Sequence, residues 1–235
     1  MNPIKTLLCQ DTNSVRSSVL VDVTPMTQVH ANEWHTHVQP LIDRYYEFDG
    51  PAVLEEDTRA DVGWDWNLYR SLAYVHNAGV QLKGSYSGKA MALAIVVRTH
   101  QNHEIPIGML TVVPEFYCNV ANVTQTRGFA WFLADAPEEF YTQVLNVAPI
   151  SGVARMLLDT AIQTTLDAKA DGSLLLHADP HGGAKLVRFY TKYGMAPLRL
   201  GHPPVSILRR RNISEYFYMD SVQSAAFCAM NDPCR

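Results

Sequence analysis

Charged residues are scarce in this sequence. Asp, Glu, Lys and Arg make up 18 % of the 235 residues, against roughly 25 % in an average soluble domain. The 19 basic and 23 acidic residues leave a formal net charge of -4, which argues against a polyanionic partner. Apolar residues, at 47 %, are common enough to build a core. The composition therefore excludes a disordered chain and a strongly basic nucleic-acid binder, and by itself it indicates no particular activity.

Long apolar runs and paired cysteines are also missing. The longest apolar run, residues 90–97, is far below the roughly 18 residues of a membrane-spanning helix, and the N-terminal segment has too short an apolar stretch for a signal peptide. The four cysteines, Cys9, Cys118, Cys228 and Cys234, form no CxxC pair, so we expect no metal site. A reducing, cytoplasmic setting without membrane contact is the resulting expectation.

The first two thirds of the chain change from helical to strand-like patterning. Residues 64–77 carry apolar side chains at helical spacing. Residues 89–98 and 105–113 are strand-like and are joined by the polar link THQNHE, which predicts an antiparallel hairpin. Residues 1–60 match no clear pattern beyond one short helix, so we expect a partly helical N-terminal extension. The remainder, residues 61–235, is expected to form one domain with an insertion at about 117–139.

The C-terminal half predicts a parallel β-α-β unit. Residues 140–149 are expected to form a strand that ends at a proline, residues 152–170 a helix, and residues 173–178 a short buried strand. A second helix, residues 184–193, and two short strands follow. The crossover in such a unit is right-handed and leaves the start of its helix at the carboxyl edge of the sheet, where α/β proteins bind ligands. The predicted fold class is α/β, a mixed central sheet (antiparallel hairpin plus parallel β-α-β unit) flanked by helices.

The turn before the predicted helix is suited to an anion. The segment PISGVAR, residues 149–155, leads directly into the helix, whose first N–H groups have no intrahelical partner. Gly152 allows a ligand to approach the backbone, and the helix dipole favours negative charge there. The turn could therefore hold a phosphate or pyrophosphate, although many β-α turns of this composition bind nothing.

Several segments, in this order, resemble the GNAT acetyltransferase superfamily. The stretch RFYTKYGM, residues 188–195, is similar to the family's FYxKxGF signature. VLNVAP followed by GVARMLLDTAI resembles the strand and helix start with which the family binds acetyl-CoA, and the hairpin and EYFYMD resemble its middle and last strands. The resemblance implies a GNAT-like sheet and an N-acetyltransferase with acetyl-CoA as cosubstrate and no metal.

Carried over residue by residue, the resemblance implies a cosubstrate site. Tyr190 corresponds to the tyrosine that protonates the departing CoA thiolate, and a tyrosine stays protonated at neutral pH; the alternative is an aromatic that packs under the sheet. Backbone groups of Leu145 and Val147 would bind the pantetheine arm. The pyrophosphate would contact the helix start, formed by Ser151, Gly152, Val153, Ala154 and Arg155. The sequence departs from the family where Pro149 replaces Arg or Gln and Gly183 replaces Asn.

The general base and the acceptor site stay open at this stage. Glu115 is our tentative base, with Asp135, Glu138, His177 and a water molecule as alternatives. The cluster of Trp64, Asp65 and Trp66 could form an aromatic and acidic entrance to the site for a cationic amine. In the alternative, Trp64 faces the core and its neighbours face solvent.

Taken together, these features predict an acyl-CoA-dependent N-acyltransferase. It would transfer an acetyl group to a primary amine of a small molecule or protein by direct attack on the thioester. One alternative is an inactive GNAT-like binding or scaffolding module, which the altered pyrophosphate turn keeps open. Another is an acetyltransferase for a nucleic-acid-linked substrate, with the triplet Arg209, Arg210 and Arg211 as its support. A homodimer is also kept open.

Overall fold

A mixed seven-stranded sheet is the centre of the fold. The computed structural model describes residues 2–10, 16–47, 58–83, 86–198 and 216–235. Within these residues the strand order of the sheet is β3-β4-β5-β6-β8-β10-β9. The bounds are β3 (Asp22–Pro25), β4 (Met91–Arg98), β5 (Glu104–Val120), β6 (Val123–Asp135), β8 (Leu174–His177), β9 (Ala196–Pro197) and β10 (Tyr216–Met219). A second sheet of three strands has the order β2-β1-β7, with β1 (Thr6–Gln10), β2 (Arg16–Leu20) and β7 (Ile150–Ser151).

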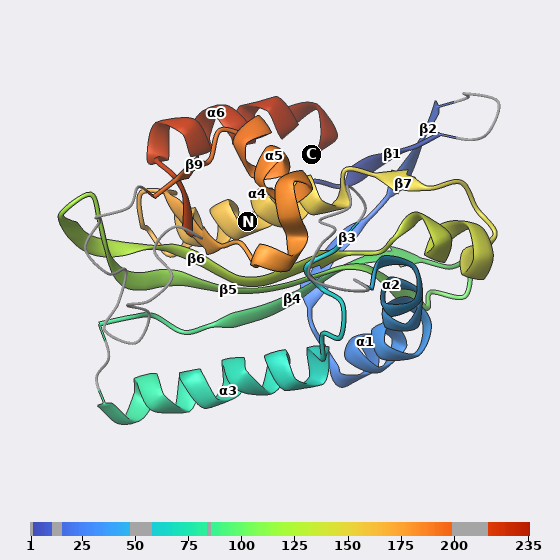
Figure 1. Cartoon of the computed structure of the whole chain (residues 1–235), viewed down its shortest axis with the longest axis horizontal. Helices are drawn as coiled ribbons and strands as arrows, with labels where there is room; N and C mark the ends of the chain where they lie inside the picture. The colour runs from blue at the N-terminus through green and yellow to red at the C-terminus, as the bar shows by residue number, and fades with distance from the viewer. Residues whose placement is uncertain (1, 11–15, 48–57, 84–85, 199–215) are drawn as a thin grey trace.

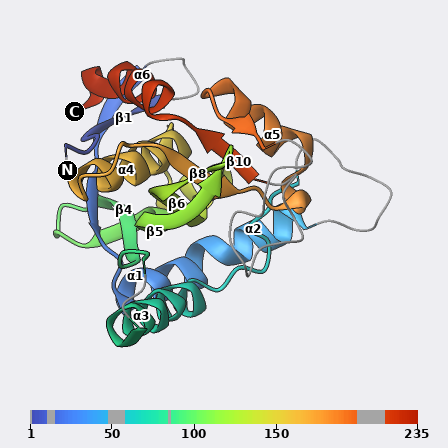
Figure 2. The ribbon, with the colours of Figure 1, turned by 90° about the vertical axis from the view of Figure 1, so that its left-hand side faces the viewer.

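Helices cover both faces of the large sheet (Figure 1). One face carries α1 (Gln28–Glu33), the π-helix η1 (Trp34–Val38), α2 (Gln39–Tyr46) and α3 (Trp66–Lys83). The other carries α4 (Val153–Asp167), α5 (Gly183–Lys192) and α6 (Ser221–Asn231). Shorter helical segments are η2 (Phe140–Leu145), η3 (Pro180–Gly182) and η6 (Asp232–Cys234). Figure 2 shows the sheet between these two helical layers, and none of the described helices is long and apolar enough to span a membrane.

The predicted hairpin and the predicted helices are confirmed. Strands β4 and β5 pair antiparallel, with Leu93 opposite Leu110 and a bulge between Ile95 and Val96. Helices α3, α4 and α5 lie where apolar spacing placed them. Strand β8 is the predicted buried strand, and β6 runs parallel to it. The fold class, an α/β fold with antiparallel and parallel strands in one sheet, is therefore confirmed.

The first strand of the β-α-β unit was wrongly placed. Residues 140–149 were expected to form that strand, but Phe140–Leu145 is the π-helix η2. Phe140 and Tyr141 are adjacent and both buried, which a one-sided helix turn permits and an alternating strand does not. The strand is instead β6, inside the stretch that we expected to be an insertion. Its apolar run GFAWFLA is the signature of a strand that is covered on both faces.

Residues near the N-terminus belong to the same packed body as the rest. Strand β3 pairs with β4, with Val23 opposite Ile95. The side chains of Trp34, Val38 and Ile42 are fully buried in the main hydrophobic core. The stretch that we expected to be an N-terminal extension thus supplies an edge strand and part of the core.

Helix α4 packs very closely on the middle of the sheet. A Cβ atom added to Gly108 of β5 would lie 2.7 Å from Cγ1 of Val153, and one added to Gly128 of β6 would overlap the hydroxyl of Thr165. Both strands therefore need glycine where the helix crosses them. This close packing holds the start of α4 at a fixed position above β5 and β6.

The pairing between β6 and β8 is short. It covers Gly128 to Ala130 on β6 and Leu174 to Leu176 on β8. Beyond this point β6 runs on to Asp135, while β8 ends at His177 and the chain turns through η3 into α5. Among the described strands, none pairs with this side of β6 beyond Ala130.

Candidate active site

A cavity of about 470 Å³ opens where β6 continues past β8. It is bordered by the second half of β6, the end of β8, the start of α4, the helix α5 and the segment before α3. Its aromatic lining residues are Tyr46, Trp64, Trp131, Phe132, Tyr141, His177, Phe189 and Tyr190. Its charged lining residues are Arg59, Asp61, Asp135, Glu138, Asp179 and Lys185. The cavity is therefore aromatic, with acidic groups in excess of basic ones.

The free edge of β6 gives this cavity backbone hydrogen-bonding groups. In a strand, alternate residues direct their N–H and C=O groups to opposite neighbours. Residues 132–135 pair with β5 on one side, so their remaining groups face the side that β8 has left. A buried N–H or C=O group needs a partner. The edge therefore suits an extended ligand with amide groups.

A guanidinium holds two carboxylates at the end of β6. Arg59 binds Asp61 in a bidentate manner, with Nε–Oδ1 at 2.8 Å and Nη2–Oδ2 at 2.7 Å. The same Nη2 donates to the carbonyl of Asp135 at 2.6 Å and approaches its carboxylate at 3.2 Å. The single positive charge of Arg59 is thus shared between the carboxylates of Asp61 and Asp135. Burial raises the pKa of the Asp135 carboxyl, and the nearby Asp61 raises it further, while Arg59 acts in the opposite direction.

Tyr190 lies on α5 and faces this cavity. Its side chain is buried, with ring centroids 5.5 Å from Phe189 and 5.3 Å from Phe217. Burial is the main cause of a raised pKa of its hydroxyl, and the charges of Asp61 and Asp135 add to it. The hydroxyl therefore stays protonated at neutral pH and is available as a proton donor.

Two other tyrosines, Tyr141 and Tyr46, also line the cavity, and no sequence pattern predicted them as site residues. Tyr141 of η2 is buried, its hydroxyl has no hydrogen-bond partner within the described residues, and burial raises its pKa. Tyr46 donates to Glu139 at 3.0 Å, and burial together with this carboxylate raises the pKa of Tyr46 to about 12. A buried hydroxyl without a partner costs about 1–3 kcal/mol, so a ligand that accepts a hydrogen bond from Tyr141 would be stabilised.

The start of α4 reaches the cavity through Ala154. Gly152 precedes the helix with φ +88°, a left-handed conformation that favours glycine, and no side chain caps the first turn. The hydroxyl of Ser151 donates to the carbonyl of Leu8 at 3.1 Å, so this side chain is engaged by β1. Val153 is buried against the sheet. Arg155 is half-buried, and its Nε has no partner in the described part of the chain.

Two of the predicted contact residues lie elsewhere. The strand expected to carry Leu145 and Val147 does not exist. Leu145 lines a separate cavity of about 150 Å³ beside Glu33, His37 and His103. Val147 is exposed. Neither residue lines the large cavity, where the free edge of β6 offers the backbone groups instead.

The remaining predicted residues divide between the cavity and other places. Glu115 lies on β5, where its carbonyl accepts from the N–H of Gly88 at 2.7 Å, and it does not line the cavity. Trp64 lines the cavity, Trp66 is buried in the core, and Asp65 caps α3 by accepting from Asn67 at 2.9 Å.

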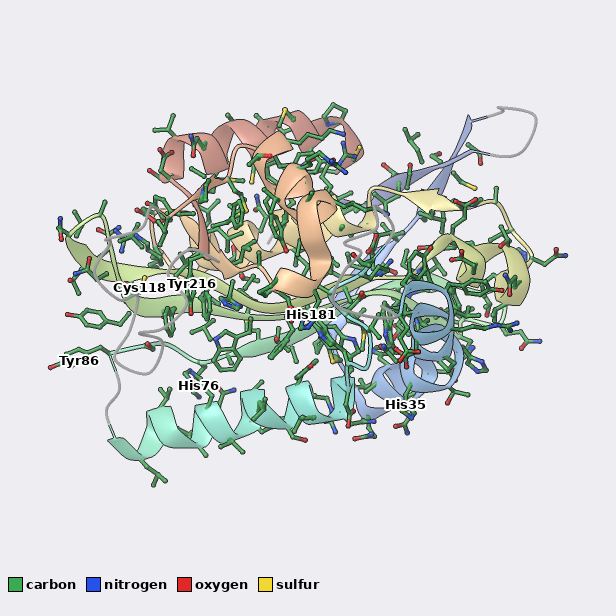
Figure 3. The ribbon with its side chains drawn as sticks, in the orientation of Figure 1. His35, His76, Tyr86, Cys118, His181 and Tyr216 are labelled. Atoms are coloured by element: carbon green, nitrogen blue, oxygen red, sulfur yellow. The ribbon has the colours of Figure 1, made fainter. Side chains whose placement is uncertain are left out.

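The alternative base candidates lie in the cavity, whereas Glu115 does not. Asp135, Glu138 and His177 all line the cavity with Tyr190. The ring of His177 packs on Tyr216, with centroids 4.9 Å apart; Figure 3 labels Tyr216 on β10.

Arg59 and Asp61 were missed, because an Arg and an Asp in a polar stretch before a helix carry no periodic signal. Arg209–Arg211 lie outside the described residues.

Among the described residues, no metal-binding group accompanies this cavity. In the part of the chain that the structure describes, three or more His, Cys, Asp or Glu side chains nowhere gather in a geometry that could hold a metal ion. All four cysteines are free.

Comparison with known proteins finds similarity at the level of solved structures. No protein-family model and no curated protein matches the chain. A GNAT-family acetyltransferase from Staphylococcus aureus Mu50 is 12 % identical, with 86 % of this chain and 99 % of that chain covered and a TM-score of 0.46. A mutant of the toxin AtaT, bound to the C-terminus of the antitoxin AtaR and to acetyl-CoA, is 14 % identical over 88 % and 96 %, with a TM-score of 0.46. A KacTA–DNA complex is 13 % identical over 89 % and 99 %, with a TM-score of 0.43.

All three structures are less than 25 % identical to this chain and have TM-scores below 0.5. They therefore support no conclusion about the family, the cosubstrate or the substrate of this chain. A function has to be inferred from the cavity of this chain itself.

Proposed function

We propose that this protein is an acyl-CoA-dependent acyltransferase that moves an acetyl group from acetyl-CoA to a primary amine. One observation carries the proposal: the cavity beside the free edge of β6 contains both the uncapped start of α4 and the buried hydroxyl of Tyr190. The free edge of β6, the start of α4 and the hydroxyl of Tyr190 together match a thioester that carries an amide-bearing arm and a pyrophosphate. An amide arm needs backbone partners, a pyrophosphate needs free N–H groups, and a thiolate needs an acid.

The proposed cosubstrate position follows from the elements around the cavity. The pantetheine arm would pair with the edge of β6 along residues 131–135. The pyrophosphate would lie at the first turn of α4, where the backbone N–H groups of Val153, Ala154 and Arg155 begin the helix. The side chain of Ser151 is held by Leu8, so we assign it no phosphate contact. Tyr141, with its unpartnered hydroxyl, is an additional donor for a carbonyl of the ligand.

The proposed reaction needs one acid and one base. The neutral amine attacks the thioester carbonyl, a C–N bond forms, and the C–S bond then breaks. The departing thiolate takes the hydroxyl proton of Tyr190, and the nitrogen loses its extra proton to a base. We assign the base to Asp135 in place of Glu115, because Asp135 lines the cavity and burial raises its pKa. A carboxylate with a raised pKa is a better proton acceptor at neutral pH.

Calorimetry with acetyl-CoA and CoA tests the proposal directly. We expect saturable binding of both, with a stoichiometry of one per chain. A chain that shows no heat with either ligand at millimolar concentration is not an acyl-CoA enzyme, and the inactive scaffolding alternative then replaces the proposal. Binding of acetyl-CoA without transfer to any of a panel of primary amines would favour the same alternative.

A further inference from the structure

The side chains that line the large cavity carry an excess of negative charge. Two basic side chains, Arg59 and Lys185, line it together with four carboxylates, those of Asp61, Asp135, Glu138 and Asp179. The carboxylates come from three separate segments: the stretch before α3, the end of β6 with the residues that follow it, and the loop between β8 and η3. Carboxylates that share a partly enclosed space repel one another, and an added cation stabilises them. The cavity therefore favours a positively charged ligand.

Arg59 is bound to two of these carboxylates and leaves Asp179 to other partners. Its guanidinium holds Asp61 and Asp135. Oδ1 of Asp179 accepts from the backbone N–H of His181 at 3.0 Å and lies 2.6 Å from Nδ1 of the same residue. The side chain of His181, labelled on η3 in Figure 3, is 78 % exposed. A neutral imidazole that donates through Nδ1 leaves the negative charge of Asp179 in place for a cationic ligand.

An aromatic group lies within the electrostatic reach of this carboxylate. Tyr69 stacks on Phe132 with ring centroids 3.7 Å apart, and Trp64 packs edge-on against both rings, at 5.4 and 5.3 Å. Trp64 and Phe132 line the cavity together with Asp179. Burial raises the pKa of Tyr69 to about 12, and the next largest cause is the charge of Asp179. We call Trp64, Tyr69 and Phe132 the aromatic wall.

A carboxylate beside aromatic rings is a combination that recognises an alkylammonium group. The ammonium pairs with the carboxylate and with the ring faces, and its methylene groups pack on the same apolar surface. The cavity contains a second, independent indication of a ligand. The side chain of Tyr141, which is 1 % exposed, lines the cavity, and its hydroxyl has no hydrogen-bond partner within the described residues. Buried polar groups in proteins normally have such a partner.

The reacting groups and the aromatic wall share this cavity. The charges of Asp61 and Asp135 act on the hydroxyl of Tyr190, and the charge of Asp61 acts on Tyr69 as well. The proposed acid, the proposed base and Asp179 therefore surround one space of about 470 Å³. A small molecule with two amino groups can place one at Asp135 and the other at Asp179.

On the basis of the acyltransferase function proposed above, we propose that the acceptor is a small aliphatic diamine without a carboxylate group. One amino group, in its neutral form, attacks the thioester carbonyl, so that a C–N bond forms and the C–S bond breaks. Its extra proton passes to Asp135, and the departing thiolate takes the hydroxyl proton of Tyr190. The second amino group stays protonated between Asp179 and the aromatic wall and takes no part in bond making. The excess of carboxylates would repel the carboxylate of an amino acid.

Initial rates of acetyl transfer to a matched series of acceptors test the proposal. Cadaverine, pentylamine and free lysine share the same alkyl chain: cadaverine carries a second amino group, pentylamine lacks it, and lysine adds a carboxylate. We expect kcat/KM for cadaverine to exceed that for each of the other two by roughly tenfold or more. A value for pentylamine or lysine that equals the value for cadaverine overturns the diamine.

Calorimetry with acetyl-CoA in the same buffer separates this proposal from the function on which it rests. A chain that binds no acetyl-CoA is not an acyl-CoA enzyme, and the diamine is then excluded with it. A chain that binds acetyl-CoA and acetylates pentylamine as well as cadaverine keeps the proposed function and loses the diamine. Binding of acetyl-CoA with transfer to none of the three acceptors also overturns the diamine.

Asp179→Asn tests the residue that is assigned to the second amino group. The amide oxygen of asparagine can still accept from the N–H of His181, so the turn should be kept while the charge is lost. The ratio of kcat/KM for cadaverine to kcat/KM for pentylamine should fall by roughly tenfold. The matched control is Asp22→Asn on β3, in an exposed ion pair with Arg98 outside the cavity, which should keep the wild-type ratio. An Asp179→Asn variant with the wild-type ratio overturns the proposal.

Discussion

At the scale of single residues, Tyr190 is the proposed acid. Tyr190→Phe removes the hydroxyl that would protonate the thiolate and keeps the buried ring. We expect kcat to fall by roughly a hundredfold or more, with acetyl-CoA affinity nearly unchanged. Steady-state kinetics and calorimetry on the same variant measure both quantities. Tyr193→Phe is the matched control, because Tyr193 lies on the same stretch, packs on Phe227 and does not line the cavity; a similar loss in both variants would remove Tyr190 from the acid role.

Asp135 should determine the acidic limb of the pH profile. A base works when it is deprotonated, so kcat/KM should rise with pH through the pKa of Asp135, which burial raises. Asp135→Asn should lower kcat/KM and flatten that limb. Glu115→Gln, outside the cavity, should leave the profile unchanged. A normal acidic limb in Asp135→Asn would assign the base to another group.

At the scale of elements, replacement of Gly152 tests whether the start of α4 binds the pyrophosphate. Gly152 and Gly194 have the same φ of +88°, and neither has an atom closer than 3.5 Å to an added Cβ. Replacement by alanine should therefore strain both to a similar extent, about 1–2 kcal/mol. Only Gly152→Ala should weaken CoA binding, by roughly tenfold, because it shifts the first turn of α4. Calorimetry and thermal unfolding of both variants separate the effect on binding from the effect on stability, and equal CoA affinities would exclude the helix start as the pyrophosphate site.

At the scale of the whole molecule, a buried ion pair joins Arg235 to helix α4. Arg235 binds Asp159 of α4 at 2.7 Å; their side chains are 7 % and 0 % exposed. The adjacent carbonyl of Cys234 accepts from the backbone N–H of Lys5 at 2.8 Å. Residues far apart in sequence are thus held together at α4.

Arg235→Ala should leave the carboxylate of Asp159 buried without its charge partner. Loss of one partner of such a pair costs about 3–5 kcal/mol, which corresponds to roughly 10 °C in Tm for a chain of this size. Thermal unfolding measures this shift. Arg98→Ala, in an exposed ion pair with Asp22, is the control and should change Tm little. Equal shifts in Tm for the two variants would mean that the buried pair contributes no more to stability than the exposed one.

Much of the architecture could be predicted from local patterns. Helix α4, strand β8 and helix α5 follow from apolar spacing and from glycine at helix ends. The hairpin of β4 and β5 follows from the polar link between these two strands. Strand β6 was missed because its run GFAWFLA is apolar on both faces and so shows no alternation. Helix α6 was missed as well, although Asp220 and Gln223 form a capping box at its start.

The sequence by itself determined the order of most elements, together with the helix and the second strand of the β-α-β unit, because periodicity and turn chemistry are local properties. The candidate role of Tyr190 came from the resemblance of residues 188–195 to a family signature. Only the tertiary structure decided which residues share a cavity. The short pairing of β6 with β8 leaves room for that cavity, and in it Arg59, which also binds Asp61, meets Asp135 across 76 residues of chain. Such contacts depend on strand register and on the packing of α4, and neither is encoded in the spacing of neighbouring residues.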